Sequence, residues 1–330
     1  MSQNFQKILI IQTAFIGDVI LATALIEKMQ EHYPNAQLDF LLRKGNEGLL
    51  KNHPHIHRVL IWNKKGKFKS LRQVLKQIRT EKYDLLINLQ RFLLTGYLAA
   101  RSKAKLVVGF DKNPFSLFFS KRFPHRFGTD EDPIHEIDRN LSLVAEYTDS
   151  QRSFPRLYPS DTDYQKVKVF QAQTYVCIAP TSVWFTKQFP AQNWIELTER
   201  LPQDITIYLL GGKGDQKACT QIQTTSRHPD IQVLAGQLSF LESAALMQGA
   251  QMNYTNDSAP LHMASAMQAP LTAIFCSTVP RFGFTPLSSS ARIVETALGL
   301  ACRPCGLHGK KACPKGHFDC AKIDVEKLLY

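Results

Sequence analysis

Short apolar runs of strand length alternate with amphipathic helical runs along most of the 330-residue chain. This alternation is typical of βαβ units, which build parallel sheets covered by helices. The first half shows strands at 7–13, 37–42, 59–63 and 84–90 and helices at 18–34 and 68–83. The second half shows strands at 175–180, 205–212, 231–236, 251–256 and 271–276 and helices at 193–201, 216–226, 239–248 and 259–268.

The rhythm is interrupted once, by the proline-containing stretch RSFPRLYPSDTD at 152–163. A chain of 330 residues with 44% hydrophobic residues is longer than most single cores remain compact. We therefore predict an α/β protein with two Rossmann-like domains, each built on a parallel sheet, and a cleft between them. The predicted boundaries are 1–160 and 161–330.

The net charge of +12 is concentrated in the first half. Residues 1–165 hold 25 Lys and Arg against 17 Asp and Glu, and the remainder holds 15 against 11. Such a positive field favours an anionic partner, either an acidic membrane surface or an acidic substrate, although solvated helix faces produce the same pattern. No nucleic-acid motif accompanies it, so we expect no nucleic-acid partner.

The N-terminus carries one early lysine and a short apolar run that Gln12 and Asp18 interrupt. No small-residue cleavage site follows, and no apolar run reaches membrane-spanning length. We expect a cytoplasmic protein.

The loop after the first predicted strand contains Gly17 followed by Asp18. A lone glycine does not provide the G-x-G-x-x-G spacing of a dinucleotide site, and a carboxylate would repel a phosphate. Asp18 is either a plain residue of the helix start or a carboxylate that is held by the helix N-terminus and points into the cleft.

Three loops of the second half carry groups suited to an anionic ligand, because ligands of open α/β sheets bind at the carboxyl ends of strands. Serine and threonine hydroxyls and a lysine ammonium can donate to phosphate oxygens, and a helix start adds backbone amides. Glycines allow close backbone approach. The candidate residues are Thr181, Ser182, Thr186 and Lys187, then Gly211 and Gly212, and finally Asp257, Ser258, Ala259 and His262.

Together these stretches resemble the heptosyltransferase group of glycosyltransferase family nine. The resemblance covers nearly the whole chain and includes ILIIQTAFIGDVILATALI, HEIDRNLSLV, SVWFTKQFP, LLGGKGD and NDSAPLHMASAMQAPLTAIFCSTVPRFGFTPL. The chain departs from the family pattern at Ala259, where the family has glycine, and at Phe189, where it has tryptophan.

The resemblance implies a GT-B architecture, in which the parallel sheets of two Rossmann-like domains face a central cleft. It implies an N-terminal acceptor domain, a C-terminal domain for a nucleotide sugar, usually ADP-heptose, and a last helix that crosses back. It implies that Asp18 is the catalytic base, that Gly17 and Asp18 meet the acceptor, and that Lys187 and Ser258 contact the diphosphate. The reaction would invert configuration on a lipopolysaccharide-core or related lipid-linked acceptor, with no cofactor required for catalysis.

Two other functions remain open on the residues alone. A nucleotide-sugar epimerase or hydrolase of similar architecture would act on the donor without an acceptor, and a basic binding module would not need Asp18 at all.

The C-terminal stretch CRPCGLHGKKACPKGHFDC holds four cysteines, Cys302, Cys305, Cys313 and Cys320. The first pair has zinc-ligand spacing, whereas the later spacing fits no common zinc motif. A structural zinc ion and free thiols in a packed loop are both compatible with it, and a cytoplasmic chain disfavours disulfides.

The stretch 113–127, NPFSLFFSKRFPHRF, alternates aromatic and basic residues. Such a mixture suits the boundary between acidic headgroups and acyl chains, and it equally suits a buried core. It predicts peripheral association with the cytoplasmic face of the inner membrane. The residues are Phe115, Phe118, Phe119, Phe123 and Phe127 with Lys121, Arg122 and Arg126.

Overall fold

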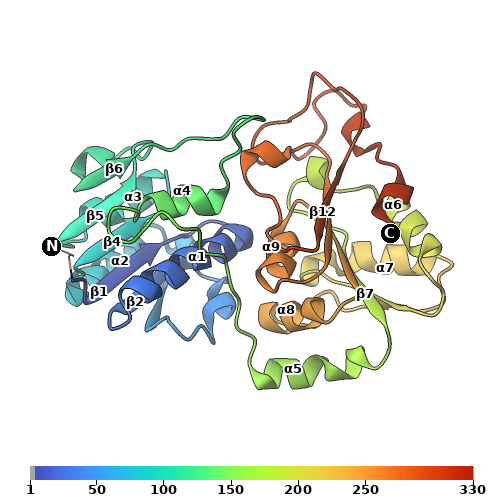
Figure 1. Cartoon of the computed structure of the whole chain (residues 1–330), viewed down its shortest axis with the longest axis horizontal. Helices are drawn as coiled ribbons and strands as arrows, with labels where there is room; N and C mark the ends of the chain where they lie inside the picture. Colours follow the sequence, from blue (N-terminus) through green and yellow to red (C-terminus); the bar gives the residue numbers. More distant parts are fainter. Residues whose placement is uncertain (1–3, 330) are drawn as a thin grey trace. The chain divides into compact units, whose positions relative to one another are not determined.

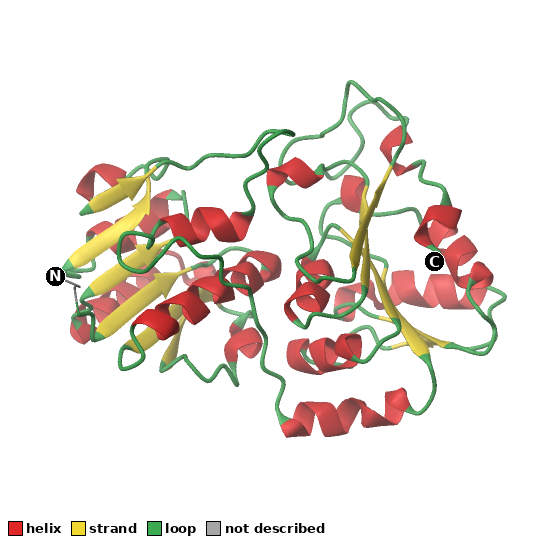
Figure 2. Cartoon of the chain, viewed as in Figure 1, coloured by secondary structure: helices red, strands yellow, loops and turns green. Residues whose placement is uncertain are grey.

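The computed structural model describes residues 4–329, and its contacts divide the chain into two compact units after Tyr158 (Figure 1). Unit 1 runs to Tyr158 and unit 2 begins at Pro159, inside the proline-containing stretch. Each unit is a parallel sheet with helices packed around it (Figure 2). Among the described residues, no helix is both long and apolar enough to span a bilayer.

Unit 1 contains a six-stranded sheet in the order β3-β2-β1-β4-β5-β6. The chain leaves β1 toward one edge, returns, and continues from β4 toward the other edge, so the order reverses between β1 and β4. The strands are β1 (Lys7–Ile11), β2 (Gln37–Arg43), β3 (Arg58–Trp62), β4 (Leu85–Asn88), β5 (Leu106–Phe110) and β6 (Lys121–Phe123). The helices are α1 (Ile16–His32), α2 (Lys67–Glu81), α3 (Leu93–Ala100) and α4 (Glu136–Ser142).

The central strands of unit 1 are apolar on both faces, as expected for a parallel sheet covered on both sides. All four residues of β4 are buried, as are residues 8–11 of β1. Helix α1 is buried over most of its surface, whereas α2 buries one stripe, which includes Leu71, Leu75 and Ile78, against this sheet. The opposite face of α2 is basic and exposed.

Unit 2 repeats the topology, with the strand order β12-β11-β10-β7-β8-β9 and the reversal between β7 and β10. Both units therefore have Rossmann-like sheets, as predicted. The strands are β7 (Tyr175–Ala179), β8 (Thr206–Leu209), β9 (Ile231–Val233), β10 (Met252–Asn256), β11 (Leu271–Phe275) and β12 (Ala291–Glu295). The helices are α5 (Asp161–Val167), α6 (Ala191–Arg200), α7 (Gln216–Thr225), α8 (Phe240–Gln248) and α9 (Ala259–Ala266).

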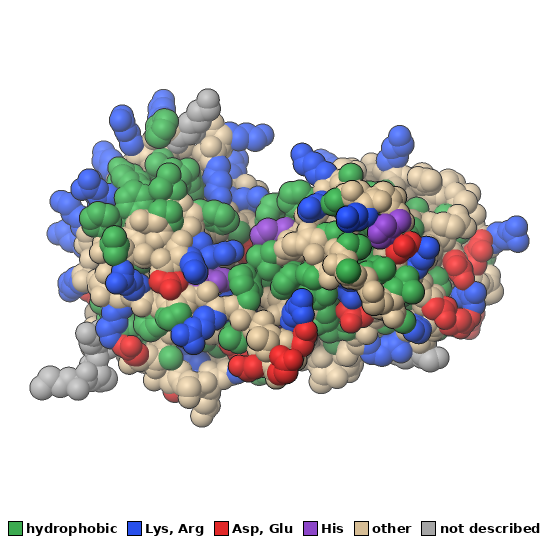
Figure 3. Space-filling model, turned by 90° about the horizontal axis from the view of Figure 1, so that it is seen from above, with side chains coloured by type: hydrophobic (Ala, Val, Ile, Leu, Met, Phe, Trp, Pro, Cys, Tyr) green, Lys and Arg blue, Asp and Glu red, His purple; other side chains and the backbone are tan. Residues whose placement is uncertain are grey.

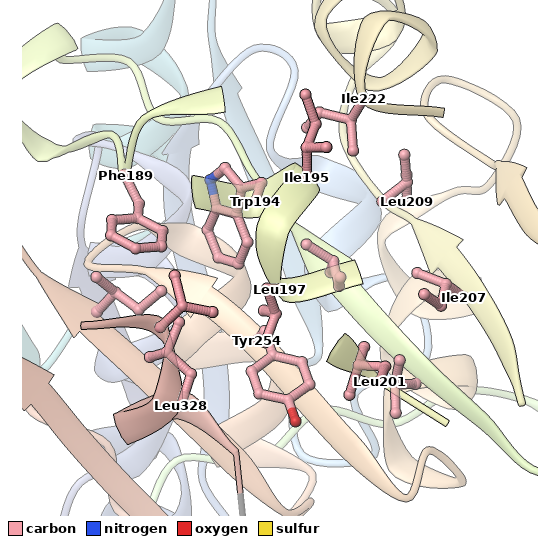
Figure 4. Packing of buried hydrophobic residues seen from close by; sticks show 14 of the residues in the cluster. Phe189, Trp194, Ile195, Leu197, Leu201, Ile207, Leu209, Ile222, Tyr254 and Leu328 are labelled. Atoms are coloured by element: carbon pink, nitrogen blue, oxygen red, sulfur yellow. The ribbon is translucent and has the colours of Figure 1, made fainter. Parts of the chain in front are cut away.

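The core of unit 2 is built around Trp194 of α6, whose ring meets that of Phe189 edge-on at 5.3 Å between centroids (Figure 4). Phe189 stands where the family has tryptophan, and it is buried. Leu328 belongs to the same cluster and comes from η9 (Val325–Leu328), a 3₁₀ turn near the end of the chain. The described chain thus ends in short turns packed on unit 2, which differs from the last crossing helix implied by the resemblance.

The reversals in strand order locate the candidate sites. At such a point the loops that follow the two central strands diverge, and this leaves room for a ligand at the carboxyl edge of the sheet. In unit 1 the loop after β1 carries Asp18. In unit 2 the loops after β7 and β10 carry Lys187 and Asp257.

Candidate active site

Asp18 lies in the first turn of α1, and its carboxylate folds back over the helix start. The backbone N–H of Phe15, the residue before the helix, donates to Asp18 Oδ2 at 3.1 Å. A negative side chain is favoured there by the helix dipole. Asp18 is half-buried, whereas Gly17 beside it is buried. The contact makes Asp18 a capping residue, and this role is compatible with a further one in chemistry.

A polar network from neighbouring strand ends fixes this loop. Thr13 Oγ1 donates to Gln90 Oε1 at 2.7 Å, and Gln90 Nε2 donates to Gln12 Oε1 at 2.7 Å. The ammonium of Lys64 donates to the carbonyl of Thr13 at 2.7 Å, and Asn46 Nδ2 donates to that of Ala14 at 3.2 Å. The loop that holds Asp18 is therefore tied to segments that follow β2, β3 and β4.

Cations gather around the same loop. The guanidinium of Arg43 lies 4.9 Å from the ring centroid of Phe15, and Lys64 lies over the ring of Trp62 at 5.2 Å. Burial, and to a lesser degree Arg43, lowers the pKa of Lys64. We did not select Arg43, Lys64 or Gln90 from the sequence, because Arg43 ends β2 while Lys64 and Gln90 follow β3 and β4, and only the strand order brings these residues to one loop.

Lys187 and Asp257 come from two different loops and form a buried ion pair. The Lys187 Nζ to Asp257 Oδ2 distance is 2.7 Å, and the two side chains are 15% and 6% exposed. Thr278 Oγ1, from the loop after β11, donates to the same carboxylate oxygen at 2.6 Å. Asp257 accepts one of the three N–H groups of the ammonium and thereby orients the others. Thr278 was not predicted from the sequence.

The start of α9 is the second feature of this region. Ser258 precedes the helix in extended conformation, and its side chain does not cap the helix; it donates weakly to the carbonyl of Asn256 at 3.4 Å. Ala259 is the first helical residue, and the buried His262 packs against the ring of Phe284. A helix N-terminus attracts anions through its amides and dipole.

Asn256 joins the loops that follow β7 and β10. Its Oδ1 accepts from the backbone N–H of Phe189 at 2.8 Å, and its Nδ2 donates to the carbonyl of Thr181 at 3.4 Å. Ser182 lies nearby, where its carbonyl accepts from Gln188 Nε2 at 2.6 Å. The structure thus holds the predicted residues of these two loops together.

Thr186 has a different environment from its neighbours, because its hydroxyl is fully buried within the protein. Its Oγ1 accepts from the backbone N–H of Lys310 at 2.8 Å and from Ser277 Oγ at 2.9 Å, and its own N–H donates to the carbonyl of Lys310 at 3.1 Å. From the sequence we predicted that Thr186 contacts the nucleotide-sugar donor. Its environment indicates instead a residue that positions Lys187.

Gly211 and Gly212 form the tight turn after β8. A Cβ atom at Gly211 would lie 2.7 Å from Cβ of Asp215, which explains why this position requires glycine. The Asp215 carboxylate in turn accepts from the N–H of Gly212 at 2.8 Å. The local structure therefore accounts for glycine at 211, whereas a Cβ atom at Gly212 would lie 3.6 Å from Asp215 Oδ2, an ordinary contact distance.

The four C-terminal cysteines line one pocket of about 330 Å³, which His317 shares. All four are free thiols, and among residues 4–329 no three His, Cys, Asp or Glu side chains are arranged to hold a metal ion. Burial raises the pKa of Cys320 to about 11. The pKa of Cys313 is lowered, because hydrogen bonds from the backbone amides of residues 315–318 outweigh its desolvation.

The cysteine segment also packs against the loops that carry Lys187 and Thr278. Gly309 adopts a φ of +75°, and a Cβ atom there would lie 2.9 Å from Lys187 Cγ. Arg303 donates to the carbonyls of Phe275, Cys276 and Thr278 at 3.1, 2.7 and 2.7 Å. No pattern in the sequence had suggested that this segment supports the site.

Two Rossmann-like units in one chain, with a carboxylate at the strand reversal of the first and a cation beside a helix start in the second, are the arrangement of a protein of the GT-B class. The model of glycosyltransferase family 9 (heptosyltransferase) matches residues 71–313. The chain belongs to this family, and the resemblance seen in the sequence is confirmed.

Individual relatives agree with this assignment. The chain is 27% identical over 282 residues to lipopolysaccharide heptosyltransferase 3 of Escherichia coli, which covers 80% of this chain and 82% of the relative. It is 24% identical over 331 residues to lipooligosaccharide heptosyltransferase 2 of Campylobacter jejuni, and the match covers 98% of this chain and 96% of the relative.

A solved structure shares the fold. The Escherichia coli ADP-heptose lipopolysaccharide heptosyltransferase II matches with a TM-score of 0.77 at 20% identity and covers 89% of this chain and 92% of that one. Escherichia coli heptosyltransferase WaaC, solved with ADP, matches with a TM-score of 0.72 at 18% identity, with 87% and 92% covered.

Proposed function

We propose that this glycosyltransferase moves a heptose from ADP-heptose onto a lipopolysaccharide-core or related lipid-linked acceptor, with inversion at the anomeric carbon. The Lys187–Asp257 pair beside the start of α9 carries the proposal. It places a lysine ammonium, oriented by a carboxylate, beside the amides of a helix start at the strand reversal of unit 2, which is where ligands bind in sheets of this type. Relatives that are named as heptosyltransferases, and a similar structure solved with ADP, support the choice of donor.

The donor diphosphate would interact with Lys187, the hydroxyl of Ser258 and the first turn of α9. As the bond between the anomeric carbon and the diphosphate oxygen breaks, negative charge grows on that oxygen. Donors fixed before the reaction stabilise such charge without reorganising. Asp257 and Thr278 keep the ammonium in place, and Thr181, Ser182 and His262 complete the donor side.

Asp18 would accept the proton of the acceptor hydroxyl as that oxygen attacks the anomeric carbon. One bond forms and one breaks in a single displacement, so configuration inverts and ADP departs with the electron pair. The contact with the N–H of Phe15 holds one carboxylate oxygen in position. The neighbouring Arg43 and Lys64 give this side of the site the positive field that an anionic acceptor requires.

The test is transfer by the Asp18→Asn variant, with Asp163→Asn as the matched control. Asp163 of α5 makes the same helix-start contact, since it accepts the N–H of Ser160 at 2.8 Å. We expect Asp18→Asn to lower turnover by about a hundredfold or more while ADP-heptose binding stays unchanged. The control should lose stability alone.

Product analysis distinguishes the other functions. Release of a modified free sugar without transfer would indicate an epimerase or hydrolase. Near-normal turnover in Asp18→Asn would refute the role of this carboxylate.

A further inference from the structure

The structure leaves five large apolar side chains of unit 1 exposed in two segments that are distant in the sequence. Leu117 and Phe118 of the turn η3 (Ser116–Phe118) are 77% and 70% exposed, and Phe92, before α3, is 60% exposed. Leu93 and Leu94 of α3 are exposed as well. We call these five residues the apolar patch.

The two segments of the patch are bound to each other. Asn113 Nδ2, at the start of the 113–118 turn, donates to the carbonyl of Gln90 at 2.8 Å and to that of Phe92 at 3.1 Å. The Asn113 side chain also fills the space over Gly96 of α3, where a Cβ atom would lie 1.9 Å from its Oδ1. The ring of Phe115 then contacts both Tyr97 of α3 and Phe118.

The same turn shows why these side chains face outward. Phe119 points inward and is buried against Gly109 of β5, where a Cβ atom would lie 2.7 Å from the Phe119 ring. With Phe119 anchored and Phe115 packed on α3, Leu117 and Phe118 are left in solvent. Exposed apolar groups gathered in this way mark an interaction surface.

The charge around the patch is positive. A groove between α2 and α3 is lined by Arg72, Lys76 and Arg79 together with Tyr97, and all three cations are exposed. Lys112 and Arg122 are exposed in the segment that contains η3 and β6. On unit 1, Figure 3 shows apolar side chains gathered in one area that Lys and Arg side chains border.

Acidic side chains are nearly absent from these segments. Residues 63–80 and 85–110 contain no Asp or Glu, and residues 111–129 contain only Asp111. The carboxylate of Asp111 accepts from the backbone N–H of His125 at 3.0 Å. The surface therefore combines protruding apolar groups with an almost uniformly positive border.

We propose that the apolar patch and its basic border dock unit 1 on an anionic lipid bilayer. Leucine and phenylalanine side chains would enter the level of the headgroups and upper acyl chains, while lysine and arginine pair with lipid phosphates. The use of this surface rests on the proposed function, since a lipid-linked acceptor is presented at a membrane. The binding itself depends only on the patch.

The exposed residues differ from those that the sequence predicted for membrane association. Of the aromatic residues predicted in 113–127, Phe119 is buried and Phe115 is packed between α3 and η3. Lys121 pairs with Glu146 and lies over the ring of Tyr147 at 5.4 Å, so it contributes little free charge. Phe92, Leu93 and Leu94, at the start of α3, were not predicted from the sequence as part of this surface.

The experiment is sedimentation of the full chain with vesicles of phosphatidylcholine alone or mixed with phosphatidylglycerol. We expect partitioning onto the anionic vesicles that is at least about tenfold stronger and weakens with salt. The double variant Leu117→Ser with Phe118→Ser should lose about tenfold or more of this partitioning. The matched control is Val169→Ser, because Val169 lies in unit 2 and is 73% exposed.

Three outcomes would overturn the proposal: equal binding to neutral and anionic vesicles, no binding at low salt, or equal losses in the patch variant and the control. Self-association that the patch variant abolishes, without vesicle binding, would show that a second copy covers the patch instead. Transfer to an acceptor freed of its acyl chains is measured in parallel. This activity tests the proposed function separately, because it does not need the bilayer.

Discussion

Replacing Lys187 by methionine separates the structural role of the Lys187–Asp257 pair from its catalytic role. Methionine keeps the length of the side chain and removes its charge. Asp257, 6% exposed, then retains only the hydrogen bond from Thr278. Breaking a fully buried pair costs about 3–5 kcal/mol, and the 15% exposure of Lys187 lets water reduce this to about 2–4 kcal/mol. For a unit of this size, that lowers the melting temperature by roughly 5–15 °C.

Turnover should fall for a different reason. Loss of a preorganised cation at the leaving group costs about 10²–10³ in rate, which corresponds to about 2.7–4 kcal/mol of transition-state stabilisation. Nucleotide affinity should fall too. Thermal unfolding, ADP titration and single-turnover transfer measure the three effects independently.

The double variant Lys187→Met with Asp257→Asn provides the decisive comparison. Removing both charges should recover about 1–3 kcal/mol of stability relative to the sum of the single variants. Transfer should stay as low as in Lys187→Met. Recovery of transfer together with stability would refute a direct role of the ammonium in the reaction.

An exposed ion pair supplies the control. Lys322 lies 2.7 Å from Asp319 and is 70% exposed. Lys322→Met should change stability by less than about 1 kcal/mol and leave transfer unaffected.

Two further predictions concern stability. Thr186→Val leaves the N–H of Lys310 and the hydroxyl of Ser277 without their acceptor, so unfolding should become about 2–4 kcal/mol easier and turnover should fall with it; an unchanged melting temperature would contradict this. Burial and the guanidinium groups of two nearby arginines lower the pKa of His125 to about 4. Because the unfolded chain binds this proton more tightly, stability should fall by about 2 kcal/mol as the pH drops from 6.5 to 4. Urea titrations of the wild type and His125→Gln should show that the variant lacks this component.

The sequence predicted most of the strands that are buried on both faces, although β5, buried over residues 107–110, was missed. The apolar run at the first strand and the one at 251–256 became β1 and β10. The strands β5, β6 and β12 and the helices α3, α4 and α5 were not predicted. Helix α3 has eight residues, too few for a clear period, and β12 is mostly only half-buried, so neither contrasts strongly with its surroundings.

The sequence predicted candidate residues within single loops, but not the contacts between loops. Lys187 and Asp257 were selected because each follows a strand and has suitable chemistry. Their pairing, and the hydrogen bond of Thr278, depend on strand order, which brings together Lys187 and Asp257 from 70 positions apart and Asp257 and Thr278 from 21 positions apart. The inward orientation of Thr186 depends on Lys310, and no local pattern near residue 186 contains that information.

The contact between Thr186 and Lys310 has a consequence for synthesis on the ribosome. The two residues are 124 positions apart, and Gly309 is the residue whose backbone allows the close approach. At about 5–20 residues per second, roughly 6–25 seconds pass between the emergence of Thr186 and that of its partner. During this interval the nascent chain can form β7 and its neighbouring strands. The loop that carries Thr186 and Lys187 still lacks the hydrogen bond from Lys310. A chain released just before residue 309 would therefore contain all six strands of the second sheet, and we expect it to bind nucleotide poorly.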